Sequence, residues 1–216
     1  MKAIGYRYLL GTIMLSFLII ILIPSQLVGG PLRIAILGWL LQLALHTRRR
    51  AGRLTWPARI LAGALLVATI VAAATGSARI LAAITQAATI VLVAASIAVL
   101  SNTLMASKVV DGSVVRGVLS IYLLLALLFA AIHEFGATVT THYLHGVDAA
   151  TPSDTLYFSV ITITTVGFGD ITPGNALAQA VSPTEALVGQ LYLVSVVAVV
   201  VSRYRSGSKP DQTPSS

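Results

Sequence analysis

Long apolar segments separated by short polar breaks make up most of the chain. A helix needs about 20 apolar residues to cross the hydrocarbon core of a bilayer, and most of these segments approach or exceed that length. The pattern therefore predicts an all-α integral membrane protein with six transmembrane helices. The six apolar segments cover about residues 6–23, 31–45, 57–74, 78–105, 114–135 and 176–203.

Two prolines fall within this pattern. Pro57 stands at the start of the third segment, in a first helical turn, where proline is tolerated. Pro183 lies inside the last segment, where proline removes a backbone donor and clashes with the preceding turn. The last helix is therefore either kinked at Pro183 or begins there. We favour the kink, because a helix of about 28 residues is long enough to cross a membrane at a tilt.

The first apolar segment has a second interpretation. Lys2 and Arg7 precede it, as basic residues precede the apolar part of a secretory signal peptide. No small-residue cleavage site follows, so we interpret the segment as a span that is retained.

The composition agrees with a membrane protein. Of the 216 residues, 56% are hydrophobic and only 10% are charged, whereas an ordinary soluble domain carries about 25% charged residues. The mean hydropathy is +0.90. The chain contains no cysteine, which excludes disulfides and thiolate metal sites.

The basic residues predict the orientation. With six spans, Arg33 and Arg79 fall on one side of the membrane and all the others on the opposite side, which the positive-inside rule identifies as the cytoplasm. Both termini are then cytoplasmic, in a multi-pass protein of the cell membrane, inner or plasma. The net charge of +7 then faces anionic lipids, and no aromatic residues accompany the basic ones to indicate nucleic-acid binding. The residues of the cytoplasmic side are Lys2, Arg7, Arg48, Arg49, Arg50, Arg53, Arg59, Lys108, Arg116, Arg203, Arg205 and Lys209.

The acidic residues show the opposite bias. Glu134, Asp148, Asp154, Asp170 and Glu185 fall toward the outer half, where an acidic mouth would concentrate cations. The alternative is that they are ordinary loop and helix-terminus residues. Glu185 in particular is either an acid within a span, and then a candidate functional group, or a first-turn acid of a helix that begins at Pro183.

Between the fifth and sixth spans lies an apolar segment that is too short to cross a bilayer. Thr151 is a plausible N-cap, Pro152 suits the first helical position, and Asp154 completes a capping box. The pattern predicts a short helix that enters the membrane, ends near Thr164 and turns back. Irregular backbone at membrane depth is tolerated only where protein buries it or where it lines a water-filled path.

Thr165-Val166-Gly167-Phe168-Gly169 follows this helix, and we refer to it as the TVGFG segment. Glycine recurs at alternate positions, and glycine adopts positive φ at little steric cost. Successive carbonyl groups can then point toward one axis, where a row of oxygens replaces the hydration shell of a cation. The glycines therefore indicate a lined path for ions.

The TVGFG segment resembles the selectivity filter of tetrameric potassium channels, with Phe168 in place of the usual tyrosine. The resemblance covers about residues 114–205 and is closest to bacterial-type six-span channels with one pore loop. It implies that the carbonyls of Thr165, Val166, Gly167 and Phe168, together with the Thr165 hydroxyl, bind potassium. Because Phe168 lacks the tyrosine hydroxyl, the filter is expected to be less firmly held.

The resemblance also predicts roles near the filter. Asp170 would stand at the outer mouth, and Thr164 and Glu185 would support the pore. In the last helix, Gly189 is a candidate gating hinge or a point of close packing. Below it, Val196 and Val200 share a helix face and are candidates for a hydrophobic gate.

One chain carries one such segment and no internal repeat, so a closed ring of carbonyls requires four identical chains. We predict a homotetramer in which residues 111–205 form the pore domain and residues 206–216 a disordered cytoplasmic tail. Residues 1–110 resemble a four-helix voltage-sensor domain without gating charges, because residues 78–105 carry only Arg79. Little voltage dependence is therefore expected.

The sequence thus predicts a non-enzymatic potassium channel that needs no cofactor beyond the permeant ion and contacts membrane lipids. The alternatives are a less selective cation channel and a subunit of a channel-like potassium transporter. Three histidines near the outer loop, His133, His142 and His145, are interpreted as solvated or interfacial, with a pH-sensing or metal-binding role as the alternative.

Overall fold

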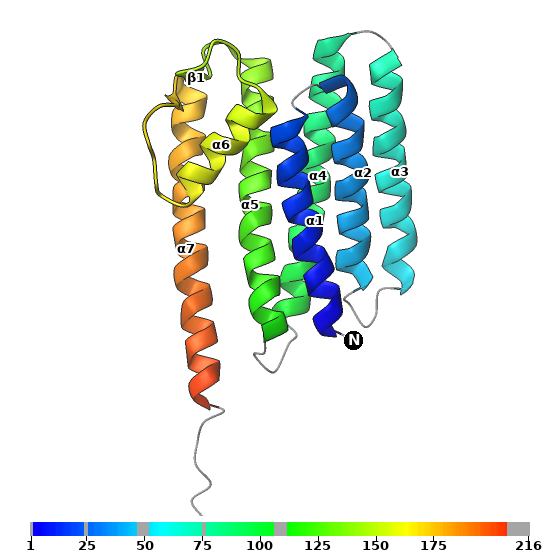
Figure 1. Ribbon diagram of the computed structural model, residues 1–216, viewed down its shortest axis with the longest axis vertical. Helices are drawn as coiled ribbons and strands as arrows, with labels where there is room; N and C mark the ends of the chain where they lie inside the picture. The colour runs from blue at the N-terminus through cyan, green and yellow to red at the C-terminus, as the bar shows by residue number, and fades with distance from the viewer. Residues whose placement is uncertain (1, 24–25, 47–51, 75–76, 106–111, 207–216) are drawn as a thin grey trace, which may run out of the picture.

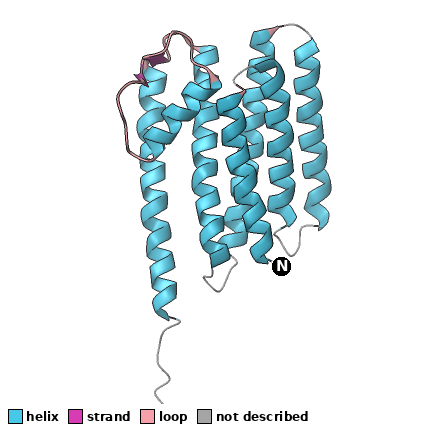
Figure 2. Cartoon of the chain, viewed as in Figure 1, coloured by secondary structure: helices cyan, strands magenta, loops and turns pink. Residues whose placement is uncertain are grey.

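The computed structural model describes residues 2–23, 26–46, 52–74, 77–105 and 112–206 of the chain. It is almost entirely helical (Figure 2), with one pair of two-residue strands that the sequence pattern did not predict. The elements are α1 (Lys2–Leu22), α2 (Gln26–His46), α3 (Gly52–Ala74), α4 (Ala78–Met105), α5 (Gly112–Val139), β1 (Leu144–His145), α6 (Pro152–Ile163), β2 (Thr172–Pro173) and α7 (Ala176–Ser206).

The six long helices run nearly side by side (Figure 1). Helices α1 to α5 form a bundle in which α2 contacts α1, α3 and α4, and α5 contacts α1 and α4. Helix α7 lies at the edge of the bundle against α5, and the short α6 packs obliquely between them at one end. We call this end the loop end, because residues 140–151 and the TVGFG segment both lie there.

The core of the bundle is apolar and continuous from α1 to α6. Leu9, Leu37, Leu92, Leu124 and Leu156 are all buried within it, from five different helices. Other large apolar side chains point outward from the same helices, as expected for helices whose surroundings are themselves apolar. Within the described residues, α4 and α5 are long and apolar enough to cross a membrane.

Helices α1, α2 and α3 begin four or five residues earlier than the pattern predicted. Helix α2 starts at Gln26 and contains Pro31 in its second turn, so the prediction that it begins at Pro31 was wrong. Helix α3 starts at Gly52, five residues before Pro57. Each proline is the sixth residue of its helix, beyond the first-turn N–H groups that lack partners within a helix, so it removes one intrahelical hydrogen bond, and the helix forms nonetheless.

Helix α7 runs through Pro183 without a break, from Ala176 to Ser206. The interpretation that the helix begins at Pro183 was therefore wrong. Its start is fixed by Asn175, whose Oδ1 accepts a hydrogen bond of 3.0 Å from the backbone N–H of Ala178. The predicted disordered tail lies, apart from Ser206, outside the described residues.

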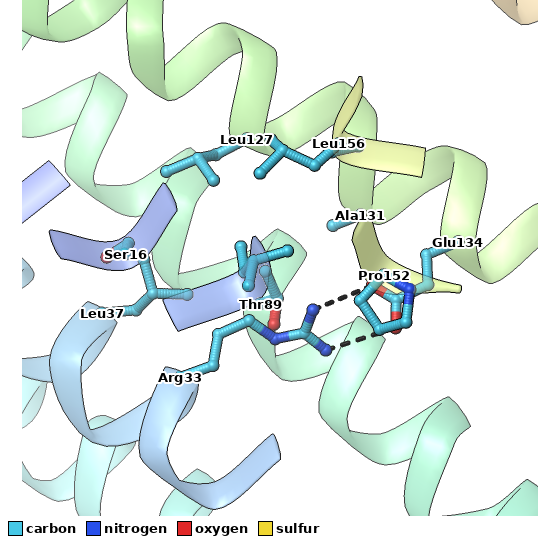
Figure 3. A pocket seen from close by; sticks show the side chains of 11 residues that line it. Ser16, Arg33, Leu37, Thr89, Leu127, Ala131, Glu134, Pro152 and Leu156 are labelled. Carbon is cyan, nitrogen blue, oxygen red and sulfur yellow. Dashed lines mark hydrogen bonds and ion pairs between the residues drawn. The ribbon is translucent and has the colours of Figure 1, made fainter. Parts of the chain in front are cut away.

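A buried ion pair joins α2 to α5 near the loop end (Figure 3). The Arg33 Nη1 and Nη2 atoms donate to the two carboxylate oxygens of Glu134 at 2.9 and 3.3 Å. Gln86 of α4 donates to Glu134 at 3.4 Å and to the Thr138 hydroxyl at 2.9 Å. The expectation that Glu134 contributes to an acidic mouth was wrong, because Arg33 neutralises its charge inside the bundle.

The ion pair lines a small pocket between the helices, with Ser16, Thr89 and Pro152 among its other walls (Figure 3). The free space there is about 10 Å³, which is room for about one water molecule. The Arg33 Nε atom is buried and lacks a hydrogen-bond partner in the described structure. The charges are thus held in a nearly dry site, where loss of one partner is costly.

This site yields a prediction about stability. Replacing Arg33→Met leaves the Glu134 carboxylate without its cation and should destabilise the fold by about 3–5 kcal/mol. The double variant Arg33→Met with Glu134→Leu should recover most of the loss, because two apolar side chains need no compensation. Thermal unfolding in detergent measures both effects. Arg79→Met, at an exposed position, is the matched control, and an unchanged melting temperature for Arg33→Met alone would contradict the prediction.

Candidate functional site

The short helix α6 begins with the predicted capping box. The Thr151 hydroxyl accepts from the backbone N–H of Asp154 at 3.3 Å, and the Asp154 carboxylate accepts from the backbone N–H of Thr151 at 2.9 Å. Pro152 occupies the first helical turn. These bonds satisfy N–H groups that a helix otherwise leaves without partners. The prediction of a short capped helix over this stretch is confirmed.

The TVGFG segment is tied by its first three N–H groups to the end of α6. The backbone N–H groups of Val166 and Gly167 both donate to the Ile161 carbonyl, at 2.9 and 3.1 Å, and that of Thr165 donates to the Thr162 carbonyl at 3.0 Å. The N–H groups are thus directed back toward the helix. The segment does not continue the helix and leaves it as irregular backbone.

The backbone of the TVGFG segment alternates in conformation. Thr165, Gly167 and Gly169 have φ values of +60°, +52° and +80°, whereas Val166 and Phe168 do not have positive φ. A left-handed residue at every second position turns successive carbonyls toward the same side, instead of the alternating sides of a β-strand. Thr165 is not a glycine, so its positive φ costs about 1–3 kcal/mol and indicates a functional constraint.

The glycines of this segment are required by backbone conformation rather than by crowding. A Cβ atom added at Gly167 or Gly169 would meet no atom within 4 Å in the chain. Every residue from 164 to 170 is exposed, and Phe168 retains 70% of its surface. A single chain therefore presents the segment on its surface.

Asp170, directly after this segment, has a partner that the sequence analysis missed. The Tyr157 hydroxyl of α6 donates to the Asp170 carboxylate at 2.7 Å. This hydrogen bond holds the pKa of Asp170 below its ordinary value, because it stabilises the ionised form. Asp170 thus keeps its negative charge in moderately acidic surroundings.

The loop that precedes α6 packs closely against the residues that follow the TVGFG segment. Strands β1 and β2 pair antiparallel, and the Gly174 N–H donates to the Tyr143 carbonyl at 2.8 Å. Gly146 has φ +91°, and a Cβ there would lie 2.0 Å from the Asp170 carbonyl oxygen. Only glycine fits this contact, so the residues that follow the TVGFG segment are held against the loop.

The interpretation of His133 was wrong, and of the two alternatives left open for Glu185 the structure favours an acid buried inside the last helix. His133 was interpreted as a solvated or interfacial residue, but it is fully buried in α5, and its Nε2 atom lies 2.9 Å from the Glu185 carboxylate. Glu185 is the tenth residue of α7 and equally buried, so it is not a first-turn acid. Its other oxygen forms a hydrogen bond with the Ser159 hydroxyl of α6.

Tyr143 extends this cluster into the loop. Its hydroxyl lies 2.9 Å from His133 Nδ1, and its ring packs where a Cβ on Gly136 would stand. Burial raises the pKa of Tyr143 to about 12. The Tyr143 hydroxyl therefore stays protonated at physiological pH. No spacing along the sequence links these residues, and only their burial in the fold brings them together.

The last turn of α6 packs closely against α7 and α5. A Cβ on Gly189 would lie 2.4 Å from the Ile163 side chain and 2.7 Å from its carbonyl oxygen, so α7 approaches the last turn of α6 closely here. The same carbonyl accepts a hydrogen bond of 3.0 Å from the Tyr122 hydroxyl of α5. The close contact at Gly189 accounts for a glycine at this position, and its predicted role as a hinge stays a prediction.

The other predicted site residues have simpler surroundings. Val196 of α7 is partly exposed, and the side chain of Val200 lies outside the described part. His142, His145 and Asp148 are exposed in the loop that precedes α6. Among the described residues no group of three His, Asp or Glu side chains could hold a metal ion, so the structure offers no support for a metal site there.

Comparison with known proteins gives one match. Residues 117–206, which include most of α5 and all of α6, the TVGFG segment and α7, match a family model described as an ion channel. No curated protein and no solved structure matches the chain. Together with the two apolar helices α4 and α5, the family match supports a non-enzymatic membrane protein with ion-channel function.

Proposed function

We propose that the chain forms a potassium-selective channel in which four copies of the TVGFG segment line one path. The observation that carries this proposal is the positive φ at Thr165, Gly167 and Gly169, with the intervening residues in ordinary conformations. This alternation directs a row of carbonyl oxygens to one side. Such oxygens replace the hydration shell of a potassium ion without the need for a cofactor.

A homotetramer accounts for the surfaces that one chain leaves open. One chain supplies one row of oxygens, and a closed ring requires identical neighbours around an axis. Beside the exposed segment, α7 presents Leu187, Leu191 and Val194, each more than half exposed. In the proposed tetramer these side chains face neighbouring chains or the path, while the outward faces of α1 and α3 contact lipid.

The proposed ion sites are the carbonyls of Thr165, Val166, Gly167 and Phe168 and the Thr165 hydroxyl. Asp170 stands at the outer end and attracts cations through its retained charge. With the loop end facing outward, both termini lie in the cytoplasm. Helix α1 begins, and helix α7 ends, at the opposite end of the bundle (Figure 1). Gly189, Val196 and Val200 remain candidates for gating.

A less selective cation channel is a second candidate, and Phe168 is the residue that favours it. Phenylalanine has no hydroxyl to bond to groups behind the segment, and 70% of the Phe168 surface is exposed in the single chain. A segment with one anchor fewer holds its oxygens less firmly around potassium, and sodium then competes better. The ratio of potassium to sodium permeability separates the two candidates.

The first prediction concerns the glycine at the centre of the segment. Gly167→Ala places a side chain on a residue with φ +52°, where non-glycine residues are strained. We expect potassium flux into liposomes to fall at least tenfold, or the preference over sodium to be lost. Purified protein in liposomes with a potassium gradient, read by flux and reversal potential, gives the measurement.

Gly63→Ala in α3 is the matched control, because its added Cβ also meets no atom within 4 Å and its φ is not positive. It should leave flux and selectivity unchanged. Full potassium selectivity in Gly167→Ala would contradict the proposal, and absence of any flux from the wild-type protein would contradict the channel function itself.

The second prediction uses the Tyr157–Asp170 hydrogen bond. In Tyr157→Phe the pKa of Asp170 should rise toward its ordinary value of 3.8, because the bond that favours the charged form is lost. As external pH falls, Asp170 is then neutralised earlier, so potassium current should decline at a higher pH than in the wild type.

Asp170→Asn should remove this acid-dependent step, whereas Asp148→Asn, at an exposed loop position, should leave it in place. Current recorded across planar bilayers at a series of external pH values measures the shift. Superimposable titrations of wild type and Tyr157→Phe would show that the hydrogen bond does not control the charge at the mouth.

The third prediction concerns membrane voltage. Helix α4 carries Arg79 alone among basic residues, and Arg79 lies exposed near its first turn. Without a row of charges that move through the membrane field, voltage does little work on the protein. Open probability in bilayers should change little between negative and positive potentials, and a steep activation curve would require charges that α4 does not have.

A further inference from the structure

A chain of buried side chains connects four segments around the TVGFG segment. It runs from Tyr143 of the outer loop to His133 of α5, then to Glu185 of α7 and to Ser159 of α6. Ser159 also donates to the Ala126 carbonyl of α5 at 2.8 Å. Tyr143 is 3% exposed and the other three side chains are fully buried, so water does not supply missing hydrogen-bond partners.

The number of hydrogens in this chain constrains the protonation of Glu185. The Ser159 hydroxyl has one hydrogen, yet its oxygen lies within hydrogen-bond distance of both the Ala126 carbonyl and a Glu185 carboxyl oxygen. If Glu185 were ionised, both neighbours would be acceptors and one contact would lack a hydrogen. If Glu185 carries a proton, its O–H donates to Ser159, and Ser159 donates to Ala126.

The contacts of His133 and Tyr143 agree with a protonated Glu185, and they require no charged group. A neutral His133 donates from Nε2 to the second Glu185 oxygen and accepts at Nδ1 from the Tyr143 hydroxyl. Every donor then has one acceptor. If His133 were an imidazolium and Glu185 a carboxylate, His133 Nδ1 would instead donate to the Tyr143 oxygen. One of the two Ser159 contacts would still lack a hydrogen.

The surroundings of Glu185 favour the uncharged form as well. The titratable side chains that face it are His133 and Tyr122 of α5 and Tyr143 of the loop, and α6 contributes the hydroxyl of Ser159. Within the described residues no Lys or Arg forms an ion pair with it. A lone charge buried in apolar surroundings is costly.

Glu134, the neighbour of His133 in the sequence, shows the opposite situation. Among the partners of its two oxygens are Arg33, which donates to both, and Gln86, and these groups only donate. Glu134 therefore suits a carboxylate, and Glu185 suits a carboxylic acid. The two buried acids thus differ in protonation although both lie near the loop end.

We propose that Glu185 is held protonated and, through Ser159 and His133, is a positioning residue that fixes α6 and the outer loop relative to one another around the TVGFG segment. The inner end of that segment is bound to α6 at Ile161, and its outer exit is bound to the loop through β1, β2 and Gly174. The hydrogen-bonded chain joins these two supports. It thereby supplies behind the segment a brace that the hydroxyl-free Phe168 does not provide.

The proton is tested by infrared spectroscopy on purified protein in detergent at neutral pH. Wild type should show the carbonyl stretch of a protonated carboxylic acid, and Glu185→Gln should remove it while Glu134→Gln leaves it. A spectrum in which Glu185→Gln removes no such band would overturn the proposal. This measurement does not depend on ion conduction, so it stands apart from a failure of the proposed function.

The positioning role rests on the proposed function and is tested by the ratio of potassium to sodium permeability in liposomes. Glu185→Gln should keep the ratio, because the glutamine amide donates to Ser159 and its carbonyl accepts from His133 in the same arrangement. Ser159→Ala breaks the link to α6 and should lower the ratio by about three- to tenfold, the range that follows from one ordinary hydrogen bond.

Ser120→Ala is the matched control, since Ser120 is also fully buried but its hydroxyl bonds to the Arg116 carbonyl of its own helix at 2.8 Å. Its permeability ratio should equal that of the wild type. A wild-type ratio in Ser159→Ala, or a loss in Glu185→Gln as large as in Ser159→Ala, would overturn the positioning role. Tetramer content and melting temperature, measured on each variant, separate altered positioning from loss of the fold.

Discussion

The fold depends on the need to place irregular backbone among apolar helices. Between α6 and α7 the chain leaves the helical conformation, and its peptide groups need partners that an apolar environment does not provide. The structure supplies partners for N–H groups of this segment and leaves its carbonyl groups facing away from them. The first three N–H groups bond back to Ile161 and Thr162, while alternating φ values collect the carbonyls on one side. The surrounding helices, glycine contacts and buried polar groups all hold this arrangement in place.

Local signals in the sequence predicted the parts of the site that are built from neighbouring residues. Thr151, Pro152 and Asp154 lie within four positions, and the capping box that they form follows from short-range geometry. Glycine at alternate positions predicted the positive φ of Gly167 and Gly169 in the same way. The positive φ of Thr165 was not foreseen, because a β-branched residue adopts it only where the surroundings enforce it.

The contacts between distant residues could not be predicted. Arg33 and Glu134 are 101 positions apart, and His133 and Glu185 are 52 apart. Their pairing depends on which faces of α2, α5 and α7 meet, and nearly uniform apolar helices give little information about rotation. The boundaries of α2 and α3 were misplaced for a different reason. Apolarity and the prolines marked the helices, whereas packing and early hydrogen bonding determined where they begin.

His133 and Glu134 are adjacent in α5, and their contacts on two sides of the helix couple two parts of the fold mechanically. Adjacent residues of an α-helix point about 100° apart, and here one side chain reaches toward α7 while the other reaches toward α2 and α4. A rotation of α5 that loosens one of these contacts displaces the other as well. Helices α2 and α4 on one side, and helix α7 on the other, are therefore mechanically coupled through a single turn of α5. A force that displaces either side is transmitted to the other.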